Sequence, residues 1–73
     1  MNNIQKEIIE AIKKDTFLPR DFSQPQKIML HGLYALVKNR TEDEIRNEIL
    51  KLECVEMIDP MTGQIQIPAH YFE

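Results

Sequence analysis

The thiol and imidazole side chains, which serve most readily as nucleophile, general base or zinc ligand, number three in this 73-residue sequence: Cys54, His31 and His70. A catalytic site needs such a group together with convergent partners. A zinc site needs about four Cys, His or acidic ligands at short spacing, and no spacing in the sequence offers them. We therefore predict no catalytic residue, no metal site and no cofactor, and we interpret Cys54 as a small core residue.

Acidic side chains are concentrated in the segment TEDEIRNEILKLE, residues 41–53, which holds five acids and two bases. A carboxylate pair can act in acid–base catalysis when its surroundings raise one pKa. These carboxylates are expected on a solvated helix face, where nothing raises a pKa. We therefore predict that the protein is not an enzyme.

The start of the acidic segment is explained by helix stability. A Thr followed three residues later by Glu forms a capping box, and acids in the first turn interact favourably with the helix dipole. The sequence therefore predicts a helix that begins after Thr41. This helix would bury Ile45, Ile49 and Leu52, and Glu48 could pair with Lys51 on its surface.

The next segment, CVEMIDPMTGQIQIP, predicts a two-stranded hairpin. Asp59-Pro60 suits the first two positions of a type I turn, and Gly63 can adopt the left-handed conformation that follows. One register buries an apolar face, and it has three cross-strand pairs: Asp59 with Gly63, Met57 with Ile65, and Val55 with Ile67. The same register predicts that three polar side chains are exposed: Glu56, Gln64 and Gln66.

Residues before the acidic segment predict two further helices. The first spans Asn3–Lys14, with isoleucines at helical spacing. The connection at residues 15–25 contains Phe17, Leu18 and Phe22, which we expect to fold back onto the core. Near the C-terminus, Tyr71 and Phe72 are expected to cover the end of the core.

The second helix is predicted from Ser23 or Gln24 to about Asn39, with Pro25 near its first position. Its apolar residues cover an arc of about 160°, wider than the stripe of an ordinary surface helix: Met29, Leu30, Leu33, Tyr34, Leu36 and Val37. Two interpretations remain open. The helix packs on both sides, or Met29 and Leu36 extend the core into a homodimer or partner interface.

The predicted fold class is α+β: three helices followed by a C-terminal β-hairpin, in a single domain of residues 1–73. The segment LVKNRTEDEIRNEILKL, two helices around a short turn, and the hairpin after it resemble the winged helix-turn-helix superfamily. The alternative is a plain three-helix bundle with an appended hairpin.

The resemblance implies that the third helix and the wing form the binding surface, which in many members of that superfamily contacts DNA. The implied positions are Asp43, Arg46, Asn47, Leu50 and Lys51 on the helix, and Met61, Thr62 and Gly63 at the wing tip. Arg46 and Asn47 could contact base edges. Four acids would face phosphate, which supplies most of the affinity in such complexes: Glu42, Asp43, Glu44 and Glu48. The wing has no Lys or Arg, so the charge opposes DNA binding.

Charge also divides the chain into two halves. Residues 1–40 carry seven Lys/Arg and four Asp/Glu (+3), whereas residues 41–73 carry two and eight (−6). The sequence therefore predicts a non-enzymatic protein-interaction module, a small regulatory or accessory protein whose acidic surface binds a protein partner of basic charge. The alternative is a dimeric winged-helix DNA-binding regulator that uses the lysines of the basic half: Lys6, Lys13, Lys14, Lys27 and Lys38.

The composition is that of a globular domain, with 42% apolar and 29% charged residues. A single cysteine cannot form an intramolecular disulfide. The sequence contains no apolar run of the length that spans a membrane, and residues 1–14 lack the apolar core of a signal peptide. We expect a cytoplasmic protein with no membrane contact.

Overall fold

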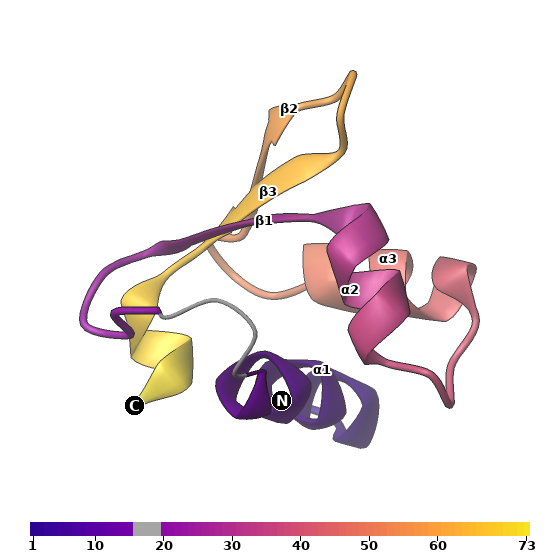
Figure 1. Ribbon diagram of the computed structural model, residues 1–73, viewed down its shortest axis with the longest axis horizontal. Coiled ribbons are helices and arrows are strands. Elements are labelled where there is room, and N and C mark those ends of the chain that lie inside the picture. Colours follow the sequence, from indigo (N-terminus) through magenta and orange to yellow (C-terminus); the bar gives the residue numbers. More distant parts are fainter. Residues whose placement is uncertain (16–19) are drawn as a thin grey trace.

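A three-stranded antiparallel sheet lies across one side of three α-helices (Figure 1). The computed structural model describes residues 1–15 and 20–73. Its elements follow in this order: α1 (Asn3–Lys14), β1 (Gln26–Met29), α2 (Leu30–Leu36), α3 (Glu42–Leu50), β2 (Glu56–Asp59), β3 (Gln64–Ile67) and the 3-10 helix η1 (Ala69–Phe72). In the sheet, β3 is the middle strand and pairs with both β1 and β2.

The core lies between the inner face of the sheet and the three helices. Every helix and two of the strands contribute, and seven large side chains are fully buried: Ile8, Ile12, Leu33, Ile45, Ile49, Ile65 and Ile67. Burial of one aliphatic side chain of this size contributes about 1.5–3 kcal/mol. The core therefore depends on isoleucines that are far apart in the sequence.

Helix α1 has the bounds that the sequence predicts, Asn3–Lys14. Asn2 forms its N-cap, since the Asn2 side chain accepts a hydrogen bond from the Gln5 backbone N–H at 2.8 Å. The Gln5 side chain accepts in return from the Asn2 backbone N–H at 2.9 Å, which completes a capping box. The isoleucines at helical spacing face the core, as predicted.

The prediction of a long second helix is wrong, because residues 26–29 form strand β1. Gln26 and Ile28 are buried whereas Lys27 and Met29 are exposed, which is the alternation of a strand. The buried Gln26 amide donates to the backbone oxygens of Asp21 and Gln24, at 2.8 and 3.0 Å. Helix α2 is therefore limited to Leu30–Leu36, and one strand precedes it, so the strands are not all C-terminal to the helices.

Because α2 is shorter than predicted, it does not have the wide apolar arc that the sequence suggested. Met29 belongs to β1 and is 51% exposed, while Leu36 is half-buried and packs against the core. The two residues therefore do not share a helix face, and the dimer interface suggested at these positions stays a prediction. Leu30, Leu33 and Val37 are buried, which is an ordinary apolar stripe for a helix packed on one side.

The hairpin register is confirmed at its centre and shifted at its turn. Met57 pairs with Ile65, as predicted, but Asp59 pairs with Gln64 and not with Gly63, because the strand bulges between Met57 and Asp59. Gly63 adopts the predicted left-handed conformation, with φ 70°. Its carbonyl accepts from the Leu30 backbone N–H at 3.0 Å, which joins the hairpin to the start of α2.

Two exposure predictions in this region are wrong. Gln64 and Gln66 are half-buried, because β3 is flanked by a strand on each side. Cys54 is exposed and not a core residue. It lies in the turn between α3 and β2 and has φ 67°, in the left-handed region.

The C-terminal segment covers the end of the core, as predicted. Phe72 is buried and stacks on Phe22, with ring centroids 5.1 Å apart. The Tyr71 hydroxyl donates to the Glu53 backbone oxygen at 2.7 Å. Phe22 therefore folds back onto the core as expected, whereas Phe17 and Leu18 lie outside the described residues.

The fold class is α+β, with three helices and a three-stranded antiparallel sheet, an arrangement compatible with a winged helix. The hairpin β2–β3, which we call the wing, extends beyond the helices in Figure 1. Within residues 1–15 and 20–73, no helix has the length and apolar character needed to cross a membrane.

Replacement of Ile67 by Ala should lower the free energy of unfolding by about 2–5 kcal/mol, because it leaves a cavity under the middle strand. The control is Gln66→Ala at the neighbouring position, whose side chain lies on the other face of β3 and should have little effect. Urea unfolding measures both variants. Equal losses would contradict the strand register.

Candidate interaction surface

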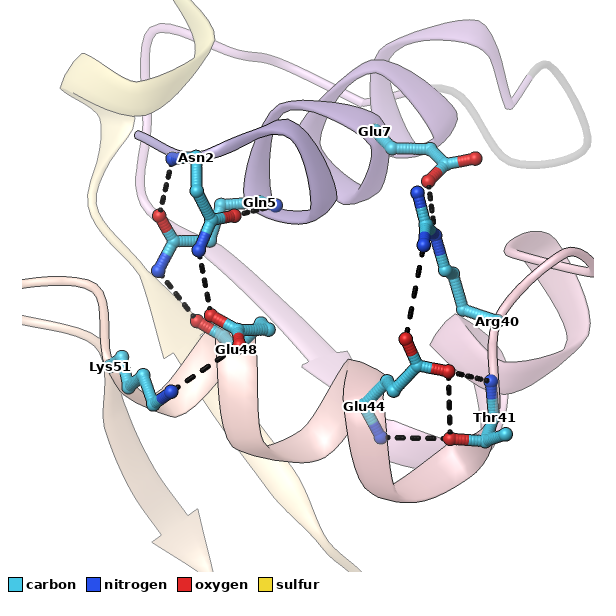
Figure 2. Close-up of polar contacts among 8 residues, drawn as sticks. All are labelled: Asn2, Gln5, Glu7, Arg40, Thr41, Glu44, Glu48 and Lys51. Atoms are coloured by element: carbon cyan, nitrogen blue, oxygen red, sulfur yellow. Dashed lines mark hydrogen bonds and ion pairs between the residues drawn. The ribbon is translucent and has the colours of Figure 1, made fainter.

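Helix α3 begins at the residue that the sequence predicts. The Thr41 hydroxyl accepts a hydrogen bond from the Glu44 backbone N–H at 3.1 Å, and the Glu44 carboxylate accepts from the Thr41 backbone N–H at 3.2 Å (Figure 2). This capping box fixes the first turn. Because Ile45 and Ile49 point into the core, the opposite side of α3 faces solvent.

Glu44 also takes part in an ion-pair network with α1. The Arg40 guanidinium donates through Nε to Glu7 at 2.8 Å, and its other branch lies 3.8 Å from the Glu44 carboxylate. The hydrogen bond with Glu7 raises the pKa of Arg40 above its ordinary value. Figure 2 shows Arg40 between the two carboxylates, so it connects the first turn of α3 to α1.

Glu48 is held by contacts to Asn2, the N-cap of α1, and to Lys51. Its carboxylate accepts from the Asn2 side-chain amide at 2.8 Å and from Lys51 at 3.3 Å. The hydrogen bond from Asn2 and then that from Lys51 lower the pKa of Glu48. The buried Gln5 amide donates to the Glu48 backbone oxygen at 3.0 Å, and so satisfies a carbonyl near the C-terminus of α3.

These contacts divide the acids of α3 into two groups. Glu44 and Glu48 lie on the flank that meets α1, where their charges are paired. Glu42 and Asp43 are exposed, and among residues 1–15 and 20–73 neither carboxylate has a hydrogen bond or ion pair. Sequence reasoning placed all four on one acidic face. It missed this division because the contacts of Arg40 with Glu7 and of Glu48 with Asn2 depend on how α1 packs against α3.

The structure brings the other predicted positions of α3 together on its solvent side. Arg46, Asn47 and Lys51 are exposed, and Leu50 is half-buried. We call this set, with Glu42 and Asp43, the α3 outer face. Two acids occupy its first turn, and two cations follow toward its C-terminal end, where Lys51 also contacts Glu48.

Tyr34 of α2 lies beside the first turn of α3, which sequence reasoning missed because it assigned Tyr34 to the apolar arc. Partial burial and then the nearby charge of Glu42 raise the pKa of Tyr34. His31 lies against the same ring, edge to face, at a centroid distance of 5.9 Å. An aromatic pair on α2 therefore borders the acidic end of the α3 outer face.

The tip of the wing is apolar and carries no cation. Met61 is 94% exposed, and Asp59 shapes the turn by accepting from the Met61 backbone N–H at 3.0 Å. Residues 55–64 contain two acids, Glu56 and Asp59, and no Lys or Arg. The predicted wing-tip position Met61 is thus the most exposed large apolar side chain in the described part of the chain.

The lysines of the basic half do not gather on one surface. Lys27 points away from the core on the outer side of the sheet, whereas α1, which carries Lys6, Lys13 and Lys14, lies with the other helices on the inner side (Figure 1). Lys13 also pairs with Glu10 at 3.7 Å. Lys38 follows α2, so these cations cannot all contact one flat ligand.

No group of three or more His, Cys, Asp or Glu side chains in residues 1–15 and 20–73 could hold a metal ion. Comparisons with protein-family models, with curated proteins and with solved structures give no match. Any functional assignment therefore depends on the surface of this chain.

Replacement of Thr41 by Ala should lower the free energy of unfolding by about 1 kcal/mol, because it leaves a backbone N–H of the first turn without its partner. The matched control is Thr62→Ala, since Thr62 is exposed in the wing and its hydroxyl bonds to no described residue. Thermal unfolding compares them. A Thr41 variant as stable as the control would contradict the capping box.

Replacement of Asn2 by Ala should raise the pKa of Glu48 toward its ordinary value, because the strongest cause of its depression is lost. A carboxyl whose pKa is lowered by folding stabilises the fold above its unfolded pKa. That stabilisation disappears as the pH falls through the folded pKa. NMR titration of the Glu48 carboxyl carbon measures the change, with Asn3→Ala as control. An identical Glu48 pKa in the unmodified protein and in both variants would contradict the hydrogen bond between Asn2 and Glu48.

Proposed function

We propose that the protein is a non-enzymatic interaction module, a small regulatory or accessory protein that binds a basic protein partner through the α3 outer face and the wing tip. One observation carries the proposal. A winged-helix protein that binds DNA presents cations and base-contacting groups at the start of its third helix and on its wing. At these positions this chain presents the unpaired acids Glu42 and Asp43 and the exposed side chain of Met61.

The surface is held in one conformation before it meets a partner. Thr41 caps α3, Arg40 ties its first turn to α1, and Asn2 and Gln5 hold its last turns. A preorganised surface loses little conformational freedom on binding, which favours affinity. This rigidity supports a recognition role for α3.

The chemistry of the surface defines the partner. Glu42 and Asp43 are exposed and unpaired within residues 1–15 and 20–73, so cations on a partner can approach them and speed the encounter. Met61 is unbranched and adaptable, which suits insertion into an apolar depression. The partner that fits is a protein with Lys or Arg side chains beside an apolar pocket.

DNA fits the same surface less well. In helix-turn-helix proteins the N-terminal residues of the recognition helix contact the bases, and here those residues are acids. The wing offers no cation to phosphate, and the lysines of the basic half are divided among α1, the outer side of β1 and the segment after α2. Because phosphate contacts supply most of the affinity for DNA, binding would be weak.

A second candidate function has one observation in its favour. Arg46, Asn47 and Lys51 are exposed on the α3 outer face, and these side chains can recognise base edges or phosphate. A dimeric DNA-binding regulator, with two such helices, is therefore the alternative. Duplex binding and its sequence selectivity separate the two proposals.

The experiment combines capture from lysate of the source cells with DNA binding. The immobilised protein should retain a basic partner, and Asp43→Lys or Met61→Asp should lose it. Association with the isolated partner should slow about tenfold in Asp43→Lys and should slow in the unmodified protein as salt rises. The matched control is Glu10→Lys, the same charge reversal at an exposed position of α1.

Random duplex DNA should bind the unmodified protein only weakly at physiological salt, and without sequence preference. Fluorescence anisotropy measures this binding. Tight, sequence-selective binding of a duplex would overturn the interaction module and favour the regulator. If Asp43→Lys, Met61→Asp and Glu10→Lys all capture the partner equally well, the partner does not bind to the α3 outer face and the wing tip.

A further inference from the structure

The sheet has an outer face that the helices leave uncovered (Figure 1). Side chains on a strand alternate between the two faces. On β1 the residues that point outward are Lys27 and Met29, and on β2 they include Glu56 and Ile58. We call the following set the outer sheet face: Lys27, Met29, Glu56, Ile58, Gln64 and Gln66.

Cross-strand pairing arranges these six side chains in two rows. Lys27 pairs with Gln66, and Gln66 pairs with Glu56, so the first row has a cation at one edge and an acid at the other. In the second row Gln64 pairs with Met29 on one side and with Asp59 on the other, and Ile58 lies in the bulge next to Asp59. Each row therefore has a glutamine at its centre.

Several properties of this face suit burial. Met29 is 51% and Ile58 is 44% exposed, which makes them two of the four large apolar side chains exposed in the described residues. Gln64 and Gln66 are half-buried, and within residues 1–15 and 20–73 neither side chain has a hydrogen-bond partner. Lys27 and Glu56 have no ion pair there, since the width of β3 separates them.

We propose that the outer sheet face binds the same face of a second copy of this chain, around a two-fold axis that runs along β3. Rotation about this axis places β1 of one copy over β2 of the other. Lys27 then meets the partner's Glu56, and Met29 lies over the partner's bulge, where Ile58 is exposed beside Asp59. Each glutamine on the axis meets its own equivalent.

The complementarity depends on this orientation. An isologous interface must be self-complementary. The first row meets this condition because Lys27 and Glu56 carry opposite charges at its two edges, so one dimer contains two equivalent Lys27–Glu56 pairs. A carboxamide has both donor and acceptor groups, so the paired glutamines can bond to each other. A two-fold axis across the strands would place Lys27 on the partner's Met29 and leave the charges unmatched.

The size of the face sets the strength of the dimer. Three strands of four residues cover about 14 by 13 Å at standard spacings. Such a patch buries much less than the roughly 1,200 Å² of a stable interface. The dimer should therefore form at high protein concentration, dissociate on dilution, and weaken with added salt because its charged contacts lie at the rim.

The experiment is sedimentation equilibrium over a wide concentration range, with charge reversals at the two edges. Lys27→Glu or Glu56→Lys alone replaces two attractions by two repulsions and should raise the dissociation constant about tenfold. The double variant Lys27→Glu/Glu56→Lys restores opposite charges across the interface and should regain the dimer. Lys38→Glu is the matched control, since Lys38 lies outside the sheet.

Circular dichroism at low concentration verifies that each variant is folded. A protein that stays monomeric at the highest concentration overturns the proposal. A dimer that neither single reversal weakens, or one that the double variant fails to recover, overturns it as well. The outer sheet face shares no residue with the α3 outer face or with Met61, although Met61 lies at the tip of the hairpin that carries part of it. Either proposal can therefore fail without the other.

Discussion

The structure depends on the pairing of β1 with β3. This pairing joins residues 26–29 to residues 64–67, which come from opposite halves of the sequence, and it makes β3 the middle strand. The fully buried Ile65 and Ile67 lie on that strand. Without β1, the wing would be an isolated two-stranded hairpin, which is marginally stable in water. The sheet therefore closes the core and determines the position of the wing.

The same constraint separates the surfaces available for binding. With the inner face of the sheet committed to the helices, α3 presents its solvent side and the opposite face of the sheet is left open. The two surfaces differ in the charged residues that they carry. Glu42 and Asp43 give the α3 outer face an acidic end, whereas Lys27 and Glu56 give the outer sheet face opposite charges at its two edges. One small fold therefore offers two chemically distinct surfaces.

Features fixed by nearby residues could be predicted from the sequence. The Thr41–Glu44 capping box and the left-handed Gly63 need only local contacts, and Met57–Ile65 follows from the hairpin pattern. Residues 26–29 could not be assigned because QKIM fits either a helix or a strand, and its pairing with β3 decided the outcome. Cys54 was misassigned because composition does not reveal a turn. Glu44 and Glu48 were placed on an open acidic face because the contact of Asn2 with Glu48, and that of Glu7 with Arg40 beside Glu44, depend on how α1 and α3 pack.

The most direct test of this account is NMR spectroscopy of residues 25–30 and 63–68 in the unmodified protein. The β1–β3 pairing predicts cross-strand nuclear Overhauser effects between Ile28 and Ile65, and slow amide exchange on β3, whose groups are bonded on both sides. Sequential helical contacts three residues apart through residues 25–29, with no contact to residues 64–67, would contradict it. In that case the second helix would begin near Pro25, and the outer sheet face would not exist.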